Sequence, residues 1–183
     1  MSQQFTPASE SRMSSAVSRY GALPLRAIVG IGFLQHGYAK LSKGPEAFAS
    51  ILYALHVPFP HLSAYLTIGV ELLGGTALFL GAFVPWVSIP AIVVLLTAMF
   101  TVHLPYGFSS IKLNTVADGR AQFGPPGYEC DLLYIAGILA LVVLGPSPWS
   151  FDRYRMRERG VRTVAGFSAR RKSFVMKRTT SPR

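Results

Sequence analysis

The chain has 183 residues, of which 50% are hydrophobic and only 14% are charged, and it carries a formal net charge of +10. Soluble globular domains average about 25% charged residues, so this composition argues against a water-soluble domain and predicts an integral membrane protein. The length suits one compact unit. We expect an all-α fold, organised as a membrane-spanning four-helix bundle.

Four apolar runs define the expected helices, and each has close to the roughly 20 residues that a helix needs to cross a bilayer core of about 30 Å. They cover residues 21–41, 62–84, 87–104 and 132–151. The second run has Glu71 as its only charged residue. Pro146 and Pro148 are expected to bend or end the fourth helix near its exit. The chain then divides into an N-terminal tail at 1–20, a four-helix domain at 21–151 and a basic tail at 152–183.

Positive charge is concentrated at the C-terminal end of the chain. After Phe151, eleven Lys and Arg residues stand against Asp152 and Glu158, so this segment holds +9 of the net charge. Lys and Arg next to membrane spans stay on the cytoplasmic side, and an even number of spans places both termini there. We expect a multi-pass protein of a bacterial-type plasma membrane. The basic tail is expected to contact anionic lipid headgroups, with no nucleic-acid partner.

Ionisable residues within the apolar runs are the candidate functional residues, because a charge in hydrocarbon is costly and usually faces a protein interior. At about 100° per residue, Arg26, His36 and Lys40 share one face of the first helix. Glu71 lies near the middle of the second helix, where either Arg26 or Lys40 can reach it, and the sequence leaves both pairings open. The structural alternative is a protonated Glu71 bonded to backbone or hydroxyl groups.

Glycine residues indicate where the first two helices touch. Gly74 and Gly75 follow Glu71 by three and four residues and so lie on its face. Gly30 and Gly37 are seven residues apart on the first helix. Because glycine lets two helix backbones approach closely, we expect the first and second helices to pack tightly at these positions.

A second group of polar residues lies at the outer ends of the expected helices and could line one outward-facing pocket. The group comprises His36, Lys40, His103, Glu129 and Asp131. For each histidine alone, the ordinary interpretation is an interfacial residue bonded to backbone or water. No HxxxH, HxH or ExxH pair is present, so no metal site is predicted. Cys130 is the only cysteine, which excludes an internal dithiol cycle.

The connection between the third and fourth helices predicts a short extracytoplasmic hairpin. Residues 111–123 alternate around Asp118 and Gly119, a favoured pair for a two-residue turn. Such a hairpin either covers the outer pocket or simply links two spans, and the sequence does not choose between these roles. The earlier loop at 42–61, with His56 and His61, is a candidate second part of the same cap.

Taken in order, these segments resemble the DoxX family of small four-span membrane proteins. The likeness covers about residues 20–152 and rests on Arg26, Gly32-Phe33-Leu34-Gln35-His36-Gly37-Tyr38-Ala39-Lys40, Glu71-Leu72-Leu73-Gly74-Gly75, Leu80-Gly81, His103, Gly107-Phe108, Gly127-Tyr128-Glu129 and Leu132-Leu133. The resemblance implies a four-helix membrane bundle, kinship to a subunit of a thiosulfate:quinone oxidoreductase, and for some members a link to oxidative-stress assemblies. The chain departs from many relatives by having Pro85 and Trp86 in place of an arginine, and by its long basic tail.

The resemblance directs attention to the same polar residues as the bilayer argument. In a redox subunit that handles a quinone or similar small molecule, we expect Glu71, His103 and His36 to move protons. Arg26, Lys40 and Glu129 are then the candidates for binding the substrate. No flavin, haem or iron–sulfur ligand pattern is evident, so a protein partner would supply the electrons. The alternative is a non-catalytic partner or assembly factor, acting as a homo-oligomer or with another membrane complex.

Overall fold

The computed structural model describes residues 20–158 and is mostly helical. Its elements are α2 (Ala22–Lys43), α3 (Pro45–Ala54), α4 (Pro60–Gly69), the π-helical segment η1 (Val70–Gly74), α5 (Gly75–Leu80), α6 (Val84–Ala98), the π-helical segment η2 (Met99–His103), the 3-10 helix η3 (Leu104–Tyr106), β1 (Leu113–Ala117), β2 (Arg120–Phe123) and α7 (Glu129–Leu144). A further helix covers residues 151–158.

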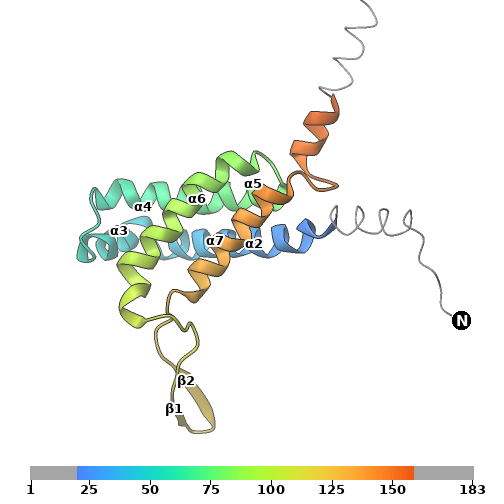
Figure 1. Ribbon diagram of the computed structural model, residues 1–183. Helices are drawn as coiled ribbons and strands as arrows, with labels where there is room; N and C mark the ends of the chain where they lie inside the picture. The colour runs from blue at the N-terminus through green and yellow to red at the C-terminus, as the bar shows by residue number, and fades with distance from the viewer. Residues whose placement is uncertain (1–19, 159–183) are drawn as a thin grey trace, which may run out of the picture.

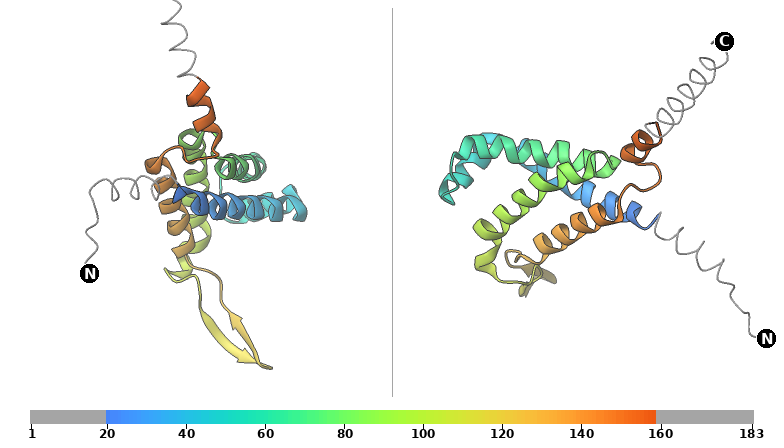
Figure 2. Two further views of the ribbon diagram at one scale, coloured as in Figure 1. Left: turned by 90° about the vertical axis from the view of Figure 1, so that its right-hand side faces the viewer. Right: turned by 45° about the horizontal axis from the view of Figure 1, so that its top comes forward.

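The helices form two layers that cross obliquely (Figures 1 and 2). In one layer α2 runs antiparallel to the continuous helical segment α4–η1–α5, and in the other α6 runs antiparallel to α7. Among the described residues, two helices are long and apolar enough to cross a membrane by length and composition alone, Pro60–Leu80 and Val84–Tyr106. The first and fourth expected spans do not meet this test of length and composition. Helix α2 carries Arg26 and two lysines, and α7 is only 16 residues long.

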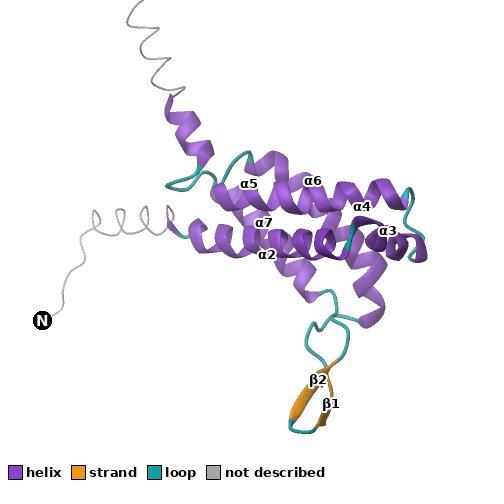
Figure 3. Cartoon of the chain, turned by 180° about the vertical axis from the view of Figure 1, so that it is seen from behind, coloured by secondary structure: helices purple, strands orange, loops and turns teal. Residues whose placement is uncertain are grey.

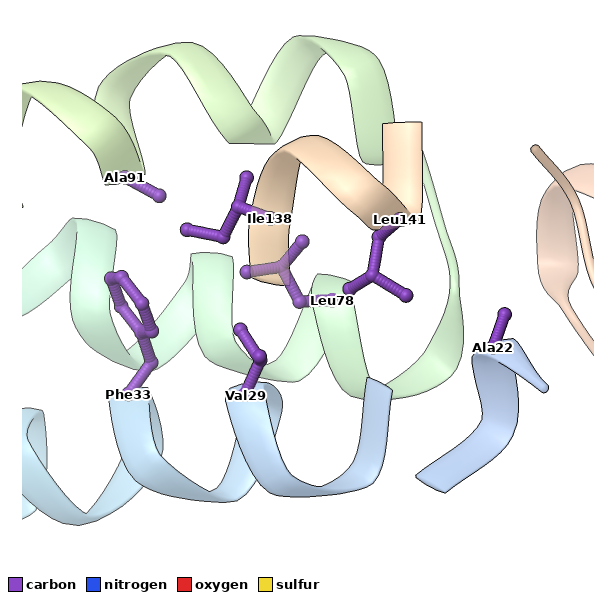
Figure 4. Close-up of a cluster of buried hydrophobic side chains, with 7 residues drawn as sticks. All are labelled: Ala22, Val29, Phe33, Leu78, Ala91, Ile138 and Leu141. Carbon is purple, nitrogen blue, oxygen red and sulfur yellow. The ribbon is translucent and has the colours of Figure 1, made fainter. Parts of the chain in front are cut away.

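One hydrophobic core joins the two layers (Figure 4). Its buried members are Ala22, Val29 and Phe33 of α2, Leu78 of α5, Ala91 of α6, and Ile138 and Leu141 of α7. Away from this core, α6 exposes large apolar side chains, with Trp86 76% and Ile89 63% exposed. Because exposed side chains of this kind would be costly in water, this surface suits contact with lipid.

The tight contact between the first two helices is confirmed. A Cβ added at Gly75 would lie 2.9 Å from the backbone nitrogen of Leu34, and one at Gly30 would lie 2.8 Å from the backbone of Phe79. Gly74 differs from the expectation, because the nearest atom to its added Cβ belongs to Val87 on α6. The glycines of η1 and α5 therefore allow close approach to two neighbouring helices.

Residues 42–61 were expected to form a loop, but they contain the helix α3. Gly44 interrupts the helix with a φ of +96°, and Pro45 then occupies the first turn of α3, where its missing N–H costs nothing. The Tyr65 hydroxyl donates to Glu46, so α3 packs against α4. After the break at Gly44, the chain therefore forms a second, short helix where a loop was expected.

The predicted hairpin is confirmed. Strands β1 and β2 pair antiparallel, with Ala117 opposite Arg120, and both turn residues have positive φ, +50° at Asp118 and +70° at Gly119. This is the geometry of a type I′ turn. All strand residues are exposed, and the hairpin extends away from the helices (Figure 3). It therefore links two helices and does not cover the bundle.

The segment after α7 is held against the turn between α5 and α6. Helix α7 ends at Leu144, before Pro146, as the prolines predicted. The two carboxylate oxygens of Asp152 accept hydrogen bonds from the backbone nitrogens of Phe83 (2.9 Å) and Val84 (3.1 Å). Asp152 was expected to belong to a basic tail outside the bundle, but it satisfies free N–H groups at the start of α6.

Replacement of Gly75 by Ala is expected to destabilise the bundle by about 1–3 kcal/mol, because the new methyl group meets backbone atoms of α2 that cannot move aside. The free energy of unfolding in mixed detergent measures the change. Gly69→Ala, in the same helical segment with open space around its Cβ, is the matched control and should leave stability unchanged or slightly raised. Equal losses in both variants would contradict the packing argument.

Asp152→Ala is expected to lower stability by about 0.5–2 kcal/mol, because it removes the acceptors of two N–H groups at the start of α6. Thermal unfolding of the purified protein measures the effect. Glu158→Ala removes a carboxylate from the exposed side of the same helix and should have little effect. A loss in Glu158→Ala as large as that in Asp152→Ala would refute the capping role.

Candidate functional site

A buried ion pair joins α2 to η1. Lys40 Nζ lies 2.5 Å from Glu71 Oε1, and the two side chains are 24% and 7% exposed. Of the two pairings that the sequence left open, the structure therefore contains Lys40 with Glu71. The other carboxylate oxygen, Glu71 Oε2, is buried and has no hydrogen-bond partner among the described residues. A buried acceptor without a donor is costly, so this oxygen marks a position where a further proton or donor would be stabilised.

Two features of the local sequence place Glu71 beside Lys40. Glu71 belongs to the π-helical segment η1, whose wider turn changes the direction of its side chains relative to an α-helix. Gly37 provides the space, because a Cβ added there would lie 3.0 Å from the Cβ of Glu71. Single π-helical turns occur frequently at functional sites, and the sequence analysis did not anticipate this one.

A small cavity opens beside Lys40, where α2 meets α3. Its volume is about 210 Å³, and it is lined by His36, Ala39, Lys40, Lys43, Ala47, Phe48 and Ile51. The Lys40 ammonium lies 5.2 Å from the centre of the Phe48 ring, within the range of a cation–π interaction. The cavity thus has a cationic end at Lys40 and apolar walls from α3. Phe48 and Ile51 were missed by the sequence analysis because α3 was expected to be a loop.

A second buried pair joins η2 to α7. His103 Nδ1 lies 2.5 Å from Asp131 Oδ2, and the side chains are 24% and 7% exposed. His103, like Glu71, belongs to a π-helical segment. Glu129 is not part of this pair, since its Oε2 accepts a hydrogen bond from the Ser110 backbone nitrogen at 3.0 Å. The carboxylate beside His103 is therefore that of Asp131, and Glu129 organises the loop instead.

Tyr134 of α7 contacts α2 beside His36 and was not selected from the sequence. Its ring packs edge-on against His36, with 6.5 Å between ring centres, and against Phe33 at 5.9 Å. Gly32 makes room for the tyrosine hydroxyl, because a Cβ there would collide with it. Tyr134 lies three residues after Asp131 on α7, on the same face, and this spacing is the signal that could have identified it.

Arg26 is separate from this group. Its Nε and Nη2 donate to the Phe79 carbonyl oxygen at 3.3 and 3.0 Å, and its Nη1 donates to Ser147 Oγ at 2.5 Å. Lys40 and Arg26 are 14 positions apart, or about 21 Å along α2. The structure thus joins Lys40 to Glu71 with His36 lining the cavity beside Lys40, pairs His103 with Asp131, and leaves Arg26 and Glu129 elsewhere.

The residues that the structure describes contain no group of three His, Cys, Asp or Glu side chains that could hold a metal ion. Cys130 is exposed and unpaired in that part of the chain. The arrangement offers hydrogen bonding and proton transfer by a lysine, two histidines, two carboxylates and a tyrosine.

Comparison with known proteins gives one match. The DoxX family model matches residues 21–104, a range that begins just before α2 and ends just after η2. It therefore includes Lys40, Glu71 and His103 but not Asp131 or Tyr134. No curated protein and no solved structure matches the chain. Residues 21–104 of the chain are therefore similar to DoxX, which is a family of membrane proteins.

Proposed function

We propose that this protein is a subunit of a membrane oxidoreductase system and binds the ring of a quinone or a similar small molecule in the cavity between α2 and α3. The observation that carries the proposal is the state of Glu71. This carboxylate is buried and has one oxygen without a donor, and its partner Lys40 lines the cavity. A bound molecule that exchanges protons with Lys40 would have a buried carboxylate directly behind it.

The size and lining of the cavity suit a ring. Its volume of about 210 Å³ is below the range of about 300–1,000 Å³ that is usual for drug-sized ligands. A single quinone ring between Phe48 and Ile51 would fit this description, with an oxygen toward Lys40. A long apolar tail would have to lie outside the cavity, against the exposed hydrophobic surface of the helices.

Quinone reduction consumes two electrons and two protons for each quinol formed. Lys40 would donate a hydrogen bond to one quinone oxygen, and Glu71 would hold the proton that replaces the one given up. His103, oriented by Asp131, would be the second proton donor, and the packed rings of His36 and Tyr134 are further candidates for the proton path. The electrons would come from a protein partner that carries a redox cofactor, since the candidate residues are proton carriers only.

This function suits a bundle of four membrane spans in a bacterial-type plasma membrane. The spans would be α2, α4–η1–α5, α6–η2 and α7, with both termini cytoplasmic by the excess of Lys and Arg after Phe151. The charged residues of α2 and α7 lower their hydropathy, but Arg26, Glu71 and Asp131 are turned inward and buried, so they would not face lipid.

Lys40→Met is expected to lower the affinity for a short-tailed benzoquinone by about tenfold or more, since a hydrogen bond from a charged donor contributes about 1.5–3 kcal/mol. Calorimetry with the purified protein in nanodiscs measures the affinity. Lys112→Met, in the hairpin region, makes the same chemical change away from the cavity and should bind normally. Because Lys40→Met leaves Glu71 unpaired, the double variant Lys40→Met/Glu71→Gln tests a folded bundle without either charge. Normal binding by that double variant would disprove the assignment.

His103→Ala is expected to slow quinone reduction by the native complex by about a hundredfold while leaving quinone affinity unchanged, because it removes a proton donor and not a binding group. The rate is measured spectrophotometrically on the complex isolated through a tag on this chain. His61→Ala removes an exposed histidine, paired with Glu46, and should keep the full rate. The same rate in both variants would exclude His103 from the proton path.

The second candidate function is a non-catalytic partner or assembly factor, and the hairpin favours it. Ile111, Leu113, Val116 and Phe123 are each at least 59% exposed on a hairpin that extends from the bundle. Replacing all four by Ser should release a protein partner while leaving quinone binding intact if the hairpin is the docking element. If the protein is only a partner or assembly factor, the native complex containing His103→Ala should assemble and reduce quinone at the normal rate.

A further inference from the structure

A second, larger cavity lies at the other end of the bundle from the Lys40–Glu71 pair. Its volume is about 530 Å³, and its lining includes Arg26, Val84, Trp86, Leu141, Val142 and Arg155. It is bounded by the start of α6, the end of α7 and the helix at 151–158, which stands beside the α5–α6 turn in Figure 1. Arg26 was a candidate for substrate binding from the sequence, but it lines this cavity and not the one beside Lys40. None of the residues to which the structure-based proposal gives a part in quinone binding or proton transfer lines it.

Arg26 is a buried cation without an anionic partner among the described residues. Its side chain belongs to a residue that is only 8% exposed, and its three hydrogen bonds go to a carbonyl and a hydroxyl oxygen. A guanidinium has five N–H donors, so two of them remain unused. Buried charges in proteins are normally paired with an opposite charge, which makes this guanidinium an incomplete anion site.

A second cation lies at the edge of the same cavity. The Arg155 guanidinium lies 5.0 Å from the centre of the Phe83 ring and 5.9 Å from that of Phe151. Asp152 also lines the cavity, but both of its oxygens are engaged by the N–H groups at the start of α6, and no ion pair joins it to either arginine within the described residues. The cavity therefore presents two cations that form no ion pair with a carboxylate of residues 20–158.

We propose that this cavity binds an anionic phospholipid, with its phosphate between Arg26 and Arg155. The size and the apolar lining of the cavity favour a phospholipid over a free phosphate ion. The cavity is within the range of about 300–1,000 Å³ typical of organic ligands, so a phosphate ion would fill only part of it. Trp86, Leu141 and Val142 supply an apolar path between α6 and α7 for an acyl chain. Basic pockets between membrane helices are an established way of holding acidic headgroups.

The lipid would also join two elements of the bundle. The helix at 151–158 contacts the α5–α6 turn through Asp152 and through the packing of Phe151 on Phe83, and the Arg26–Ser147 bond joins α2 to the loop after α7. A phosphate between Arg26 and Arg155 would add a direct bridge from α2 to the helix at 151–158. Because the two cavities are separate, loss of lipid binding should leave the quinone site unchanged. The inference therefore does not depend on the proposed function.

The test uses the full chain, purified in detergent and placed in nanodiscs of phosphatidylcholine with or without phosphatidylglycerol. Native mass spectrometry after release from the disc counts the lipid molecules that stay bound. We expect one phosphatidylglycerol to be retained, and Arg155→Gln to lower this retention about fivefold or more, by loss of one cation. Arg153→Gln makes the same charge change on the same helix outside the cavity and should retain the lipid.

A second pair of variants tests the cavity without changing charge. Val142→Trp should fill the acyl path and lower retention, whereas Val143→Trp, at a neighbouring position that is 85% exposed, should not. Equal retention by Val142→Trp and Val143→Trp, equal retention of phosphatidylcholine and phosphatidylglycerol, or displacement of the lipid by inorganic phosphate alone would each overturn the proposal.

Discussion

The buried pair of Lys40 and Glu71 is the interaction on which the arrangement of the bundle depends. Neither charge can be left alone in an apolar interior, because an unpaired buried charge costs several kcal/mol. The pair therefore fixes the position of α2 against η1, and Gly37 leaves the room that the side chains of Glu71 and Leu72 need. The cavity lies directly beside this pair because α2 breaks at Gly44, four residues after Lys40.

The buried cations at the two ends of α2 have different kinds of partner. At one end Lys40 is neutralised by a carboxylate, and at the other Arg26 is held by the carbonyl oxygen of Phe79 near the end of α5 and by Ser147. A carbonyl at a helix C-terminus carries only a partial negative charge, so it does not cancel a guanidinium. One end of the bundle is therefore suited to proton exchange within a neutral pair, and the other to binding an anion.

Two of the candidates for proton transfer, one acidic and one basic, lie in π-helical segments. Glu71 lies in η1 and His103 lies in η2, and each pairs with a residue of another helix. A π-helical turn inserts one extra residue and so rotates the following helix relative to what precedes it. This lets the flanking α-helical segments keep their apolar faces in the core while the polar residue points to its partner. The range that matches the DoxX family model, residues 21–104, contains both segments.

The sequence by itself determined the membrane character of the chain, the glycine contacts between the first two helices, the hairpin at Asp118 and Gly119, and the end of α7 before Pro146. Each of these depends on composition or on a local pattern of a few residues. The partner of each charge was decided only by the tertiary structure: Lys40 and not Arg26 for Glu71, and Asp131 and not Glu129 for the histidine of η2. Helical periodicity tells which residues share a face, but the π-helical turns and the break at Gly44 change the rotation and register of the helices, and these decide which faces meet.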